Sequence, residues 1–299
     1  MTRLPAKQIS WFLFFMAAIV AWYGVTLLLA RVGQRHWSFR LQPVRDLDLT
    51  EPLVPWSAPG PVPGRAFRLA VAPVVSPEKT LERYQELARY LANRFSRTPV
   101  LLQRSSYAEV NNLVRYDQCD LAFVCTNALI LGERDFGMRA VAIPVIGGAI
   151  TYHSYIVVRA DAPEESLLAL RGKRFVSADL MSTSGWLYPA DWLRTRGENP
   201  ATFFAEHLIA GSHDQALLAV ATGRADGAAV DSLVYTQVLR EDPRLRELVR
   251  VILKSPAFGM PPLVVSPRMA PAFRRRLQAL LFRMKDDPEG GPILALLGI

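Results

Sequence analysis

From about residue 66 to residue 285 the chain alternates short apolar runs with amphipathic segments, and this alternation constrains the fold more than any other feature. The first run, "FRLAVAP", has the length and composition of a buried strand. The segment after it, "PEKTLERYQELARYLANRFS", carries apolar residues at helical spacing behind a proline. Strands that alternate with helices form parallel sheets with crossover connections. The sequence therefore predicts an α/β fold.

The alternation fills two halves of the chain, and 299 residues are enough for two domains of roughly 100–150 residues each. We expect residues 65–153 and 257–299 to form lobe 1 and residues 154–256 to form lobe 2. The chain would then pass between the lobes twice, near Ile150–Ser154 and near Ser255–Pro262. Two such crossings indicate a clamp with a ligand cleft at the hinge.

The N-terminal region precedes this fold. From Trp11 to Ala30 the chain has twenty residues without a charge, enough for a helix to cross a bilayer. We expect residues 1–35 to be an uncleaved membrane anchor; the alternative is a cleaved signal peptide, for which Leu28 is a poor cleavage-site residue. Residues 36–64 include six prolines, all between positions 43 and 64, and should form an extended linker.

The charges and cysteines exclude several classes of function. The chain has 35 Lys and Arg against 27 Asp and Glu, but the basic excess is scattered and no nucleic-acid motif occurs, so we expect no nucleic-acid partner. Cys119 and Cys125 lack the spacing of a zinc site, and we expect neither a metal nor a cofactor. If residues 119–125 run extended, the two cysteines lie roughly 20 Å apart, too far for a disulfide.

Polar side chains gather where predicted strands end and the next helices begin. In open α/β sheets, ligands bind beyond the carboxyl ends of strands, near helix N-termini. A serine, threonine or aspartate before a helix is also an ordinary N-cap, and that interpretation stays open for each position taken alone. The positions become a candidate site because all of them lie along one edge of the predicted layout. The candidate ligand-binding residues are Cys125, Thr126, Asn127, Ser182, Thr183, Ser184, Gly185, His213 and Asp231.

The run from Ser182 to Gly185, "STSG", has the chemistry of an anion site. The first N–H groups of a helix lack intrahelical partners, and the helix dipole places partial positive charge there. Serine and threonine hydroxyls add donors, and Gly185 allows close approach. Asp231 could accept a hydrogen bond from a protonated ligand oxygen and would repel a fully ionised anion. A small oxyanion or oxyacid is therefore the expected ligand.

Two segments together resemble the PhnD family of periplasmic binding proteins, which serve phosphonate, phosphite and phosphate uptake. They are "SADLMSTSGWLYP" and "GSHDQALLAVATGRADGAAVDS", and "LAVAP" and "SYAEVNNLVRYDQCDLAFV" resemble the family too. The resemblance covers roughly residues 66–285. It implies a type II periplasmic-binding-protein fold that clamps its ligand between two lobes, and a domain that works in the periplasm beyond the anchor. The matching residues are Ser182, Thr183, Ser184, Gly185, Pro189, Gly211, Ser212, His213, Gly223, Asp226, Asp231 and Ser232.

The loop after "DLAF" departs from the family pattern, which usually has a small residue and a tyrosine there. This chain has Val124, Cys125 and Thr126 instead. The cysteine resembles the AioX-type branch, whose members bind arsenite through one cysteine and signal to a membrane histidine kinase. Trivalent arsenic is soft and thiophilic, so sulfur ligation suits it. The alternative is that Cys125 is a small buried residue at a strand end.

The expected function is a periplasmic receptor without enzymatic activity. We expect it to hold arsenite first, then phosphite, phosphonate or phosphate, and to act as the sensor for a membrane histidine kinase. The alternative is the substrate-binding component of a phosphonate or phosphite ABC transporter, with a permease as partner. Two further alternatives are a thiol hydrolase that uses Cys125, His213 and Asp231, and a domain that binds no solute and only docks onto a kinase or permease.

Overall fold

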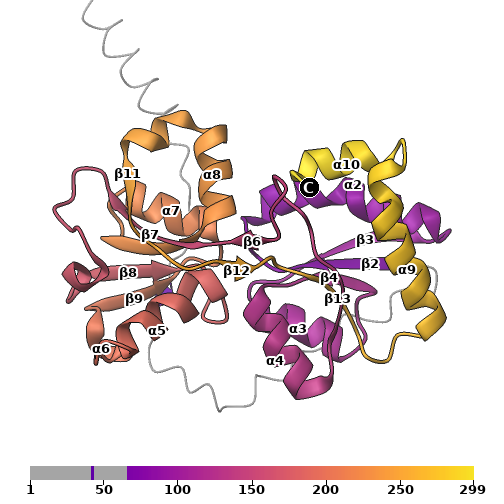
Figure 1. The fold of residues 1–299 in the computed structure, drawn as a ribbon, viewed down its shortest axis with the longest axis horizontal. Helices are drawn as coiled ribbons and strands as arrows, with labels where there is room; N and C mark the ends of the chain where they lie inside the picture. Colours follow the sequence, from indigo (N-terminus) through magenta and orange to yellow (C-terminus); the bar gives the residue numbers. More distant parts are fainter. Residues whose placement is uncertain (1–41, 44–65) are drawn as a thin grey trace, which may run out of the picture. The chain divides into compact units, whose positions relative to one another are not determined.

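Two separate β-sheets organise the computed structural model, which describes residues 42–43 and 66–299 (Figure 1). The first sheet defines lobe 1. Its strands β2, β3 and β4 are parallel, whereas β13 runs antiparallel to its neighbours β4 and β5. In spatial order the strands are β3 (Thr98–Gln103), β2 (Ala66–Val71), β4 (Leu121–Phe123), β13 (Leu263–Val265) and β5 (Arg139–Ala142).

Helices from both ends of the described chain cover this sheet. The first helix, α2, begins at Pro77, where the missing N–H costs nothing because a first-turn donor has no intrahelical partner. The helices of lobe 1 are α2 (Pro77–Arg94), α3 (Tyr107–Arg115), α4 (Thr126–Phe136), α9 (Pro271–Arg283), the short 3₁₀ turn η4 (Met284–Asp286) and α10 (Gly290–Leu297).

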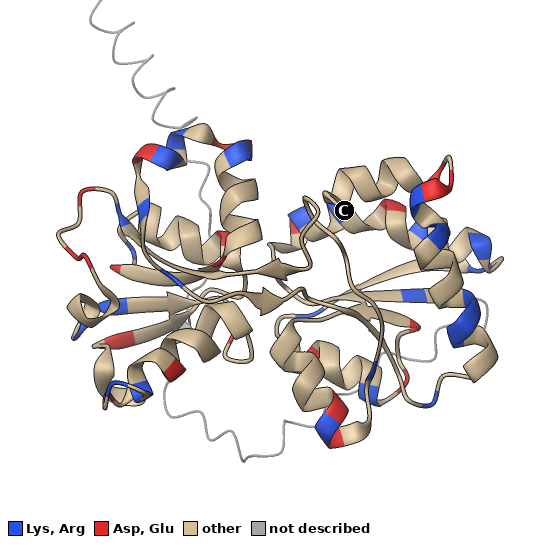
Figure 2. Ribbon diagram, in the orientation of Figure 1, with Lys and Arg blue, Asp and Glu red and all other residues tan. Residues whose placement is uncertain are grey.

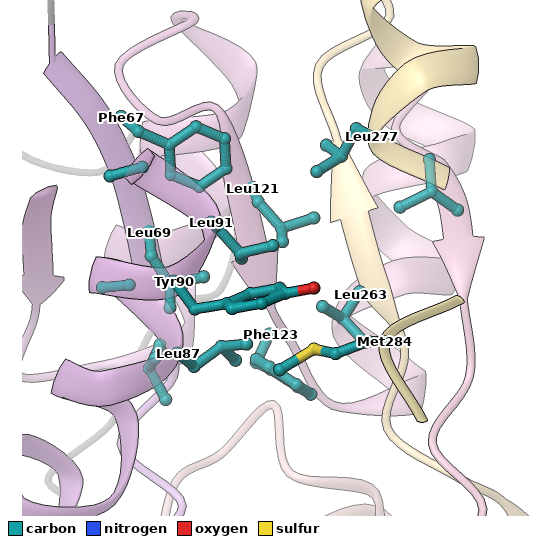
Figure 3. Close-up of a cluster of buried hydrophobic side chains, with 14 of the residues drawn as sticks. Phe67, Leu69, Leu87, Tyr90, Leu91, Leu121, Phe123, Leu263, Leu277 and Met284 are labelled. Atoms are coloured by element: carbon teal, nitrogen blue, oxygen red, sulfur yellow. The ribbon is translucent and has the colours of Figure 1, made fainter. Parts of the chain in front are cut away.

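The core of lobe 1 joins segments that lie far apart in the sequence (Figure 3). Leu91 of α2 and Leu69 of β2 are fully buried beside Leu277 of α9 and Met284 of η4. Burial of one such side chain stabilises the folded state by about 1.5–3 kcal/mol. The C-terminal helices are therefore an integral part of the first lobe.

The second sheet defines lobe 2. Strands β8, β9 and β10 are parallel, and β7 runs antiparallel to β10 and β11. In spatial order its strands are β1 (Gln42–Pro43), β9 (Glu206–Ile209), β8 (Arg174–Ser177), β10 (Gly227–Asp231), β7 (Ser154–Arg159) and β11 (Val249–Lys254). Its helical segments are η1 (Leu167–Leu170), η2 (Thr183–Leu187), α5 (Tyr188–Arg194), α6 (Pro200–Phe203), α7 (His213–Ala221), α8 (Ser232–Glu241) and η3 (Pro243–Glu247).

Within residues 66–299 the chain crosses between the two sheets in two segments that pair with each other. Strand β6 (Thr151–Tyr152) lies antiparallel to β12 (Phe258–Gly259), with Tyr152 opposite Phe258 (Figure 1). Their rings lie 6.0 Å apart, centroid to centroid. The two crossing segments thus form a short two-stranded connection between the sheets.

The structure describes part of the expected linker, residues 36–64, and none of the expected anchor, residues 1–35. Within the expected linker, Gln42 and Pro43 pair with Ile209 and Leu208 at the edge of the second sheet. Proline is tolerated there because an edge strand need not donate on its outer side. The expected anchor, residues 1–35, lies outside the described residues. In the part that the structure describes, no helix combines the length and the apolar character needed to cross a membrane.

Candidate functional site

The "STSG" run forms a tight turn of π-helix, η2, after the central strand β8. The Oγ of Ser182 accepts the Gly185 N–H at 3.0 Å, so Ser182 is the N-cap of this turn. Ser184 is 1% exposed, and its carbonyl accepts the Ser154 hydroxyl at 2.6 Å. The turn is thus fixed to β7, and its hydroxyl-bearing residues are buried at the carboxyl end of the sheet.

His213 sets the direction of the hydrogen bonds around Ser182. The backbone N–H of Asp231 donates to His213 Nδ1 at 3.1 Å, so the neutral ring carries its proton on Nε2. Burial lowers the pKa of His213 to about 3, which keeps the ring neutral. His213 Nε2 lies 3.2 Å from Ser182 Oγ and therefore donates to it. Because Ser182 Oγ already accepts two N–H groups, its own proton is left to donate to a ligand.

Asp231 is the N-cap of α8 and a buried acid. Its Oδ1 accepts the N–H groups of Leu233 at 2.7 Å and Val234 at 3.4 Å. Burial raises the pKa of Asp231 to about 7, although these two hydrogen bonds oppose the shift. The carboxyl group can therefore hold or release a proton near neutral pH, as a group that discriminates between protonation states of a ligand must.

The loop after β4 in lobe 1 meets η2 of lobe 2. The Asn127 backbone N–H donates to Thr183 Oγ1 at 2.9 Å, and Asn127 Nδ2 donates to the Met181 carbonyl at 3.0 Å. The Thr126 hydroxyl donates to the Gly259 carbonyl in β12 at 2.7 Å. The structure thus brings together the two groups of residues that the sequence places on facing lobes.

Cys125 begins α4 as its N-cap. Its sulfur accepts the Ala128 N–H at 3.4 Å and donates to the Met181 carbonyl at 3.3 Å. Burial raises the pKa of Cys125 to about 11, so the group is a neutral thiol at neutral pH. Neither ring nitrogen of His213 is paired with this sulfur, since both have the partners given above. This geometry does not favour the thiol hydrolase, whose nucleophile needs its base within hydrogen-bond reach.

Two tyrosines that the sequence analysis does not single out belong to the same site. Tyr107, the first residue of α3, is 1% exposed, and its hydroxyl has no hydrogen-bond partner within residues 42–43 and 66–299. Burial raises its pKa most, and the nearby Cys125, Asp179 and Asp231 add to the rise. A buried hydroxyl without a partner costs free energy unless a ligand or water satisfies it. The signal was present: Tyr107 follows β3 at the expected sheet edge.

The second is Tyr152 of the hinge strand β6. It is 2% exposed, and its pKa is raised by burial first and then by Asp231 and Cys125, while the hydroxyls of Thr183 and Thr126 oppose the shift. Its hydroxyl therefore lies among groups from both lobes. The sequence does not point to this role, because a tyrosine in a strand usually indicates core packing.

The segments that carry Cys125, Tyr152 and Ser182 have no lysine or arginine. No Lys or Arg occurs in residues 121–132, 140–158 or 175–193. In Figure 2 the crossing strands β6 and β12 are tan, the colour of residues other than Lys, Arg, Asp and Glu. On these segments positive potential comes from helix N-termini and N–H groups, which hold oxyanions without a counter-charge.

A cavity of about 420 Å³ lies elsewhere in lobe 1, beside β5 and α9. It has none of the candidate residues, and its arginine and glutamate side chains are not buried. Converging buried donors mark a binding site more strongly than volume does, so we place the candidate site at the facing lobes. The cavity is lined by Glu133, Met138, Arg139, Ala140, Val141, Arg274 and Gln278.

Residues 69–299 match the family described as ABC transporter, phosphonate, periplasmic substrate-binding protein. The phosphate-import protein PhnD of Mycolicibacterium smegmatis is 32% identical over 180 residues, which are 56% of this chain and 55% of that protein. The phosphonates-binding periplasmic protein of Escherichia coli is 25% identical over 197 residues, 64% of this chain and 58% of that protein. The matched stretch therefore spans less than two thirds of either relative.

Solved structures resemble the fold. A binding protein component of an ABC phosphonate transporter from Pseudomonas aeruginosa has a TM-score of 0.73 at 21% identity, covering 78% of this chain and 79% of that one. PhnD1 from Prochlorococcus marinus, in complex with methylphosphonate, has a TM-score of 0.70 at 17% identity, covering 78% and 90%. These similarities establish the two-lobed α/β fold of periplasmic binding proteins.

Proposed function

The chain belongs to the phosphonate-type periplasmic substrate-binding proteins of ABC transporters, and we propose that it holds a small phosphorus oxyanion between its two lobes. Phosphonate, phosphite and phosphate share the tetrahedral centre and the oxygens that such a site would bind. The protein would act in the periplasm and deliver its ligand to an ABC permease. It would bind without turnover, as a receptor.

One observation carries this proposal: the hydrogen bonds to Ser182 leave its hydroxyl only as a donor. The hydroxyl of Tyr107, buried and without a protein partner, supports it from lobe 1. A site made of donors binds an acceptor-rich ligand, and an oxyanion offers acceptors on every oxygen. Isothermal titration calorimetry with methylphosphonate, phosphite and phosphate tests the proposal, and absence of heat with all three would contradict it.

The role in an ABC transporter is better supported than the role as a sensor, which the sequence alone favours. The two curated relatives reported above are named for phosphate import and phosphonate binding, and the two solved structures for phosphonate transport and methylphosphonate binding. A kinase partner and a membrane anchor at residues 1–35 remain predictions from the sequence. An N-terminal sequence of the mature protein beginning after Ala30 would contradict the anchor.

We expect ligand affinity to fall as pH rises above about 7. Asp231, whose pKa burial raises to about 7, and a doubly ionised oxyanion would both be negative at higher pH. Binding then requires uptake of one proton to be shared between them, so the dissociation constant should rise by up to about tenfold per pH unit. Calorimetric titrations of methylphosphonate from pH 5 to pH 9 measure this slope.

The Asp231→Asn variant is the control for this pH dependence. The amide keeps an oxygen for the Leu233 and Val234 N–H groups but has no proton to lose. Its affinity should vary less steeply than that of the wild type above pH 7. Parallel profiles for both proteins would show that Asp231 does not hold the shared proton.

Arsenite through Cys125 is the weaker candidate. The thiolate, rather than the thiol, is the ligand form of cysteine, and a pKa of about 11 disfavours the thiolate. We expect the Cys125→Ser variant to bind methylphosphonate within about threefold of the wild type, since serine can also serve as an N-cap. We expect no heat from arsenite with either protein. Arsenite binding that is lost on Cys125→Ser would instead support the thiol site.

A further inference from the structure

We infer that Asp179 and Asp214 are closure residues: carboxylates of lobe 2 that cap helices of lobe 1 while the lobes are in contact, and so set how long the ligand stays bound. Neither residue is part of the ligand contacts proposed above. The inference rests on the proposed function, because it concerns the release of the same ligand. It follows from three contacts between the lobes.

The first contact joins Asp179 to α3. Asp179 follows β8 in lobe 2 and is 7% exposed. Its Oδ2 accepts the backbone N–H of Tyr107, the first residue of α3 in lobe 1, at 3.0 Å. Its Oδ1 accepts the N–H of Met181 in its own lobe at 2.7 Å. One carboxylate thus bonds to both lobes through different oxygens.

The second contact joins Asp214 to α2. Asp214 Oδ1 accepts the N–H of Ser76, the N-cap residue of α2, at 2.9 Å, and the Ser212 hydroxyl at 2.6 Å. The Ser76 side chain makes no capping hydrogen bond of its own. Beside it, the His213 N–H donates to the Val74 carbonyl of lobe 1 at 3.0 Å. The start of α2 is therefore capped from the opposite lobe.

The third contact, from Asn127 N–H to Thr183 Oγ1, has the same form at α4. The helices that follow β2, β3 and β4 therefore all receive a side-chain oxygen from lobe 2 at their N-termini. In lobe 2, Asp231 caps α8 and Ser166 caps η1 from within the same lobe, whereas α7 donates its His213 N–H to the Val74 carbonyl of lobe 1. Capping by side chains of the opposite lobe thus marks the facing ends of α2, α3 and α4.

This arrangement determines which helix N-termini remain open to the anion when the two lobes are in contact. A helix N-terminus attracts negative charge, and three of them point from lobe 1 toward lobe 2. When the lobes are in contact, carboxylates occupy the ends of α2 and α3, and only α4 faces a neutral hydroxyl. The oxyanion is thereby directed to the Ser182–Gly185 turn. When the lobes part, the N–H groups of Ser76 and Tyr107 lose these caps to water.

The Asp179→Asn variant tests the inference most sharply. Both oxygens of Asp179 accept N–H groups, so an amide of the same shape must turn one NH₂ donor toward an N–H. We expect methylphosphonate to dissociate about tenfold faster, with its association rate within about twofold of the wild type. Asp214→Asn can keep an oxygen toward Ser76 and should speed dissociation by only about threefold. Stopped-flow fluorescence measures both rates.

Asp242→Asn is the matched control. Asp242 caps η3 through the Arg244 N–H at 3.2 Å, entirely within lobe 2, so its replacement should leave the dissociation rate unchanged. A rate for Asp179→Asn equal to that of the wild type would overturn the inference. So would equal acceleration in the Asp242→Asn control, because closure would then not be the cause.

A second measurement separates this inference from the proposed function. Spin labels at two exposed positions, Arg275 in α9 and Arg246 in η3, report the distance between the lobes without any ligand. Asp179→Asn should shift the ligand-free distribution toward longer distances, even if methylphosphonate, phosphite and phosphate all fail to bind. The inference is contradicted if wild type and variant give superimposable distance distributions without ligand and equal dissociation rates where a ligand binds.

Discussion

Replacing Ser182 with alanine is expected to weaken methylphosphonate binding by about 100-fold, or about 2.8 kcal/mol. The hydroxyl is held as a donor by His213 and by the Gly185 N–H, so the variant loses a charge-assisted hydrogen bond to the anion, worth about 1.5–3 kcal/mol. It also leaves two buried N–H groups without an acceptor. Isothermal titration calorimetry at pH 7 measures the change.

Ser166→Ala is the matched control for this substitution. Ser166 caps η1 in the same lobe, accepting the Ala169 N–H at 3.4 Å, away from the facing lobes. Loss of a cap costs stability of about 0.5–2 kcal/mol but should leave ligand affinity unchanged. An affinity of Ser182→Ala within about threefold of the wild type would show that the turn does not hold the anion.

Gly185→Ala is expected to abolish measurable binding and to destabilise the protein by about 1–3 kcal/mol. A Cβ at this position would lie 2.9 Å from Ser182 Oγ and 3.1 Å from His213 Cε1. Those are the two groups whose mutual hydrogen bond orients the donor, so even a small shift breaks the arrangement. Calorimetry measures binding, and thermal unfolding measures the loss of stability.

The effect on binding must be separated from the effect on stability, and Gly227→Ala does this. A Cβ at Gly227 in β10 would lie 2.5 Å from Leu170 Cδ1, a steric conflict in the core of the same lobe. That variant should unfold at a lower temperature and yet bind methylphosphonate normally while folded. If Gly185→Ala also binds normally, the close approach at η2 is not needed for the ligand.

The elements with strong local patterns are predictable from the sequence. Helix α2 has a proline at its start and apolar residues at helical spacing, and β2 is a buried apolar run, so both lie where expected. Strand β9, Glu206–Ile209, is not predicted from the sequence, because its four residues include a glutamate and a histidine. It becomes a strand through its pairing with β8, for example His207 opposite Phe175.

In the site, too, some residues can be recognised from the local sequence and others only from contacts between distant segments. Ser182 and Asp231 are evident from the sequence because each lies between a predicted strand and the helical turn that it caps. Tyr152 is not, since its hydroxyl gains importance only when the two lobes meet, and Tyr107 has only its place after β3 as a signal. The capping of α3 by Asp179 joins residues 72 positions apart and leaves no local pattern at all.

Strand β13 lies between β4 and β5, although all the residues from 143 to 262 separate it from β5 in the sequence. During synthesis or export, β5 therefore emerges long before the strand that will hold it in the sheet. The segment from β7 to β11 contains every strand of the second sheet except β1. It is complete before β13 emerges, so the second sheet can fold first. The first-made lobe should thus be the last to become protease-resistant, with its apolar edge open to chaperones until residues 263–265 arrive.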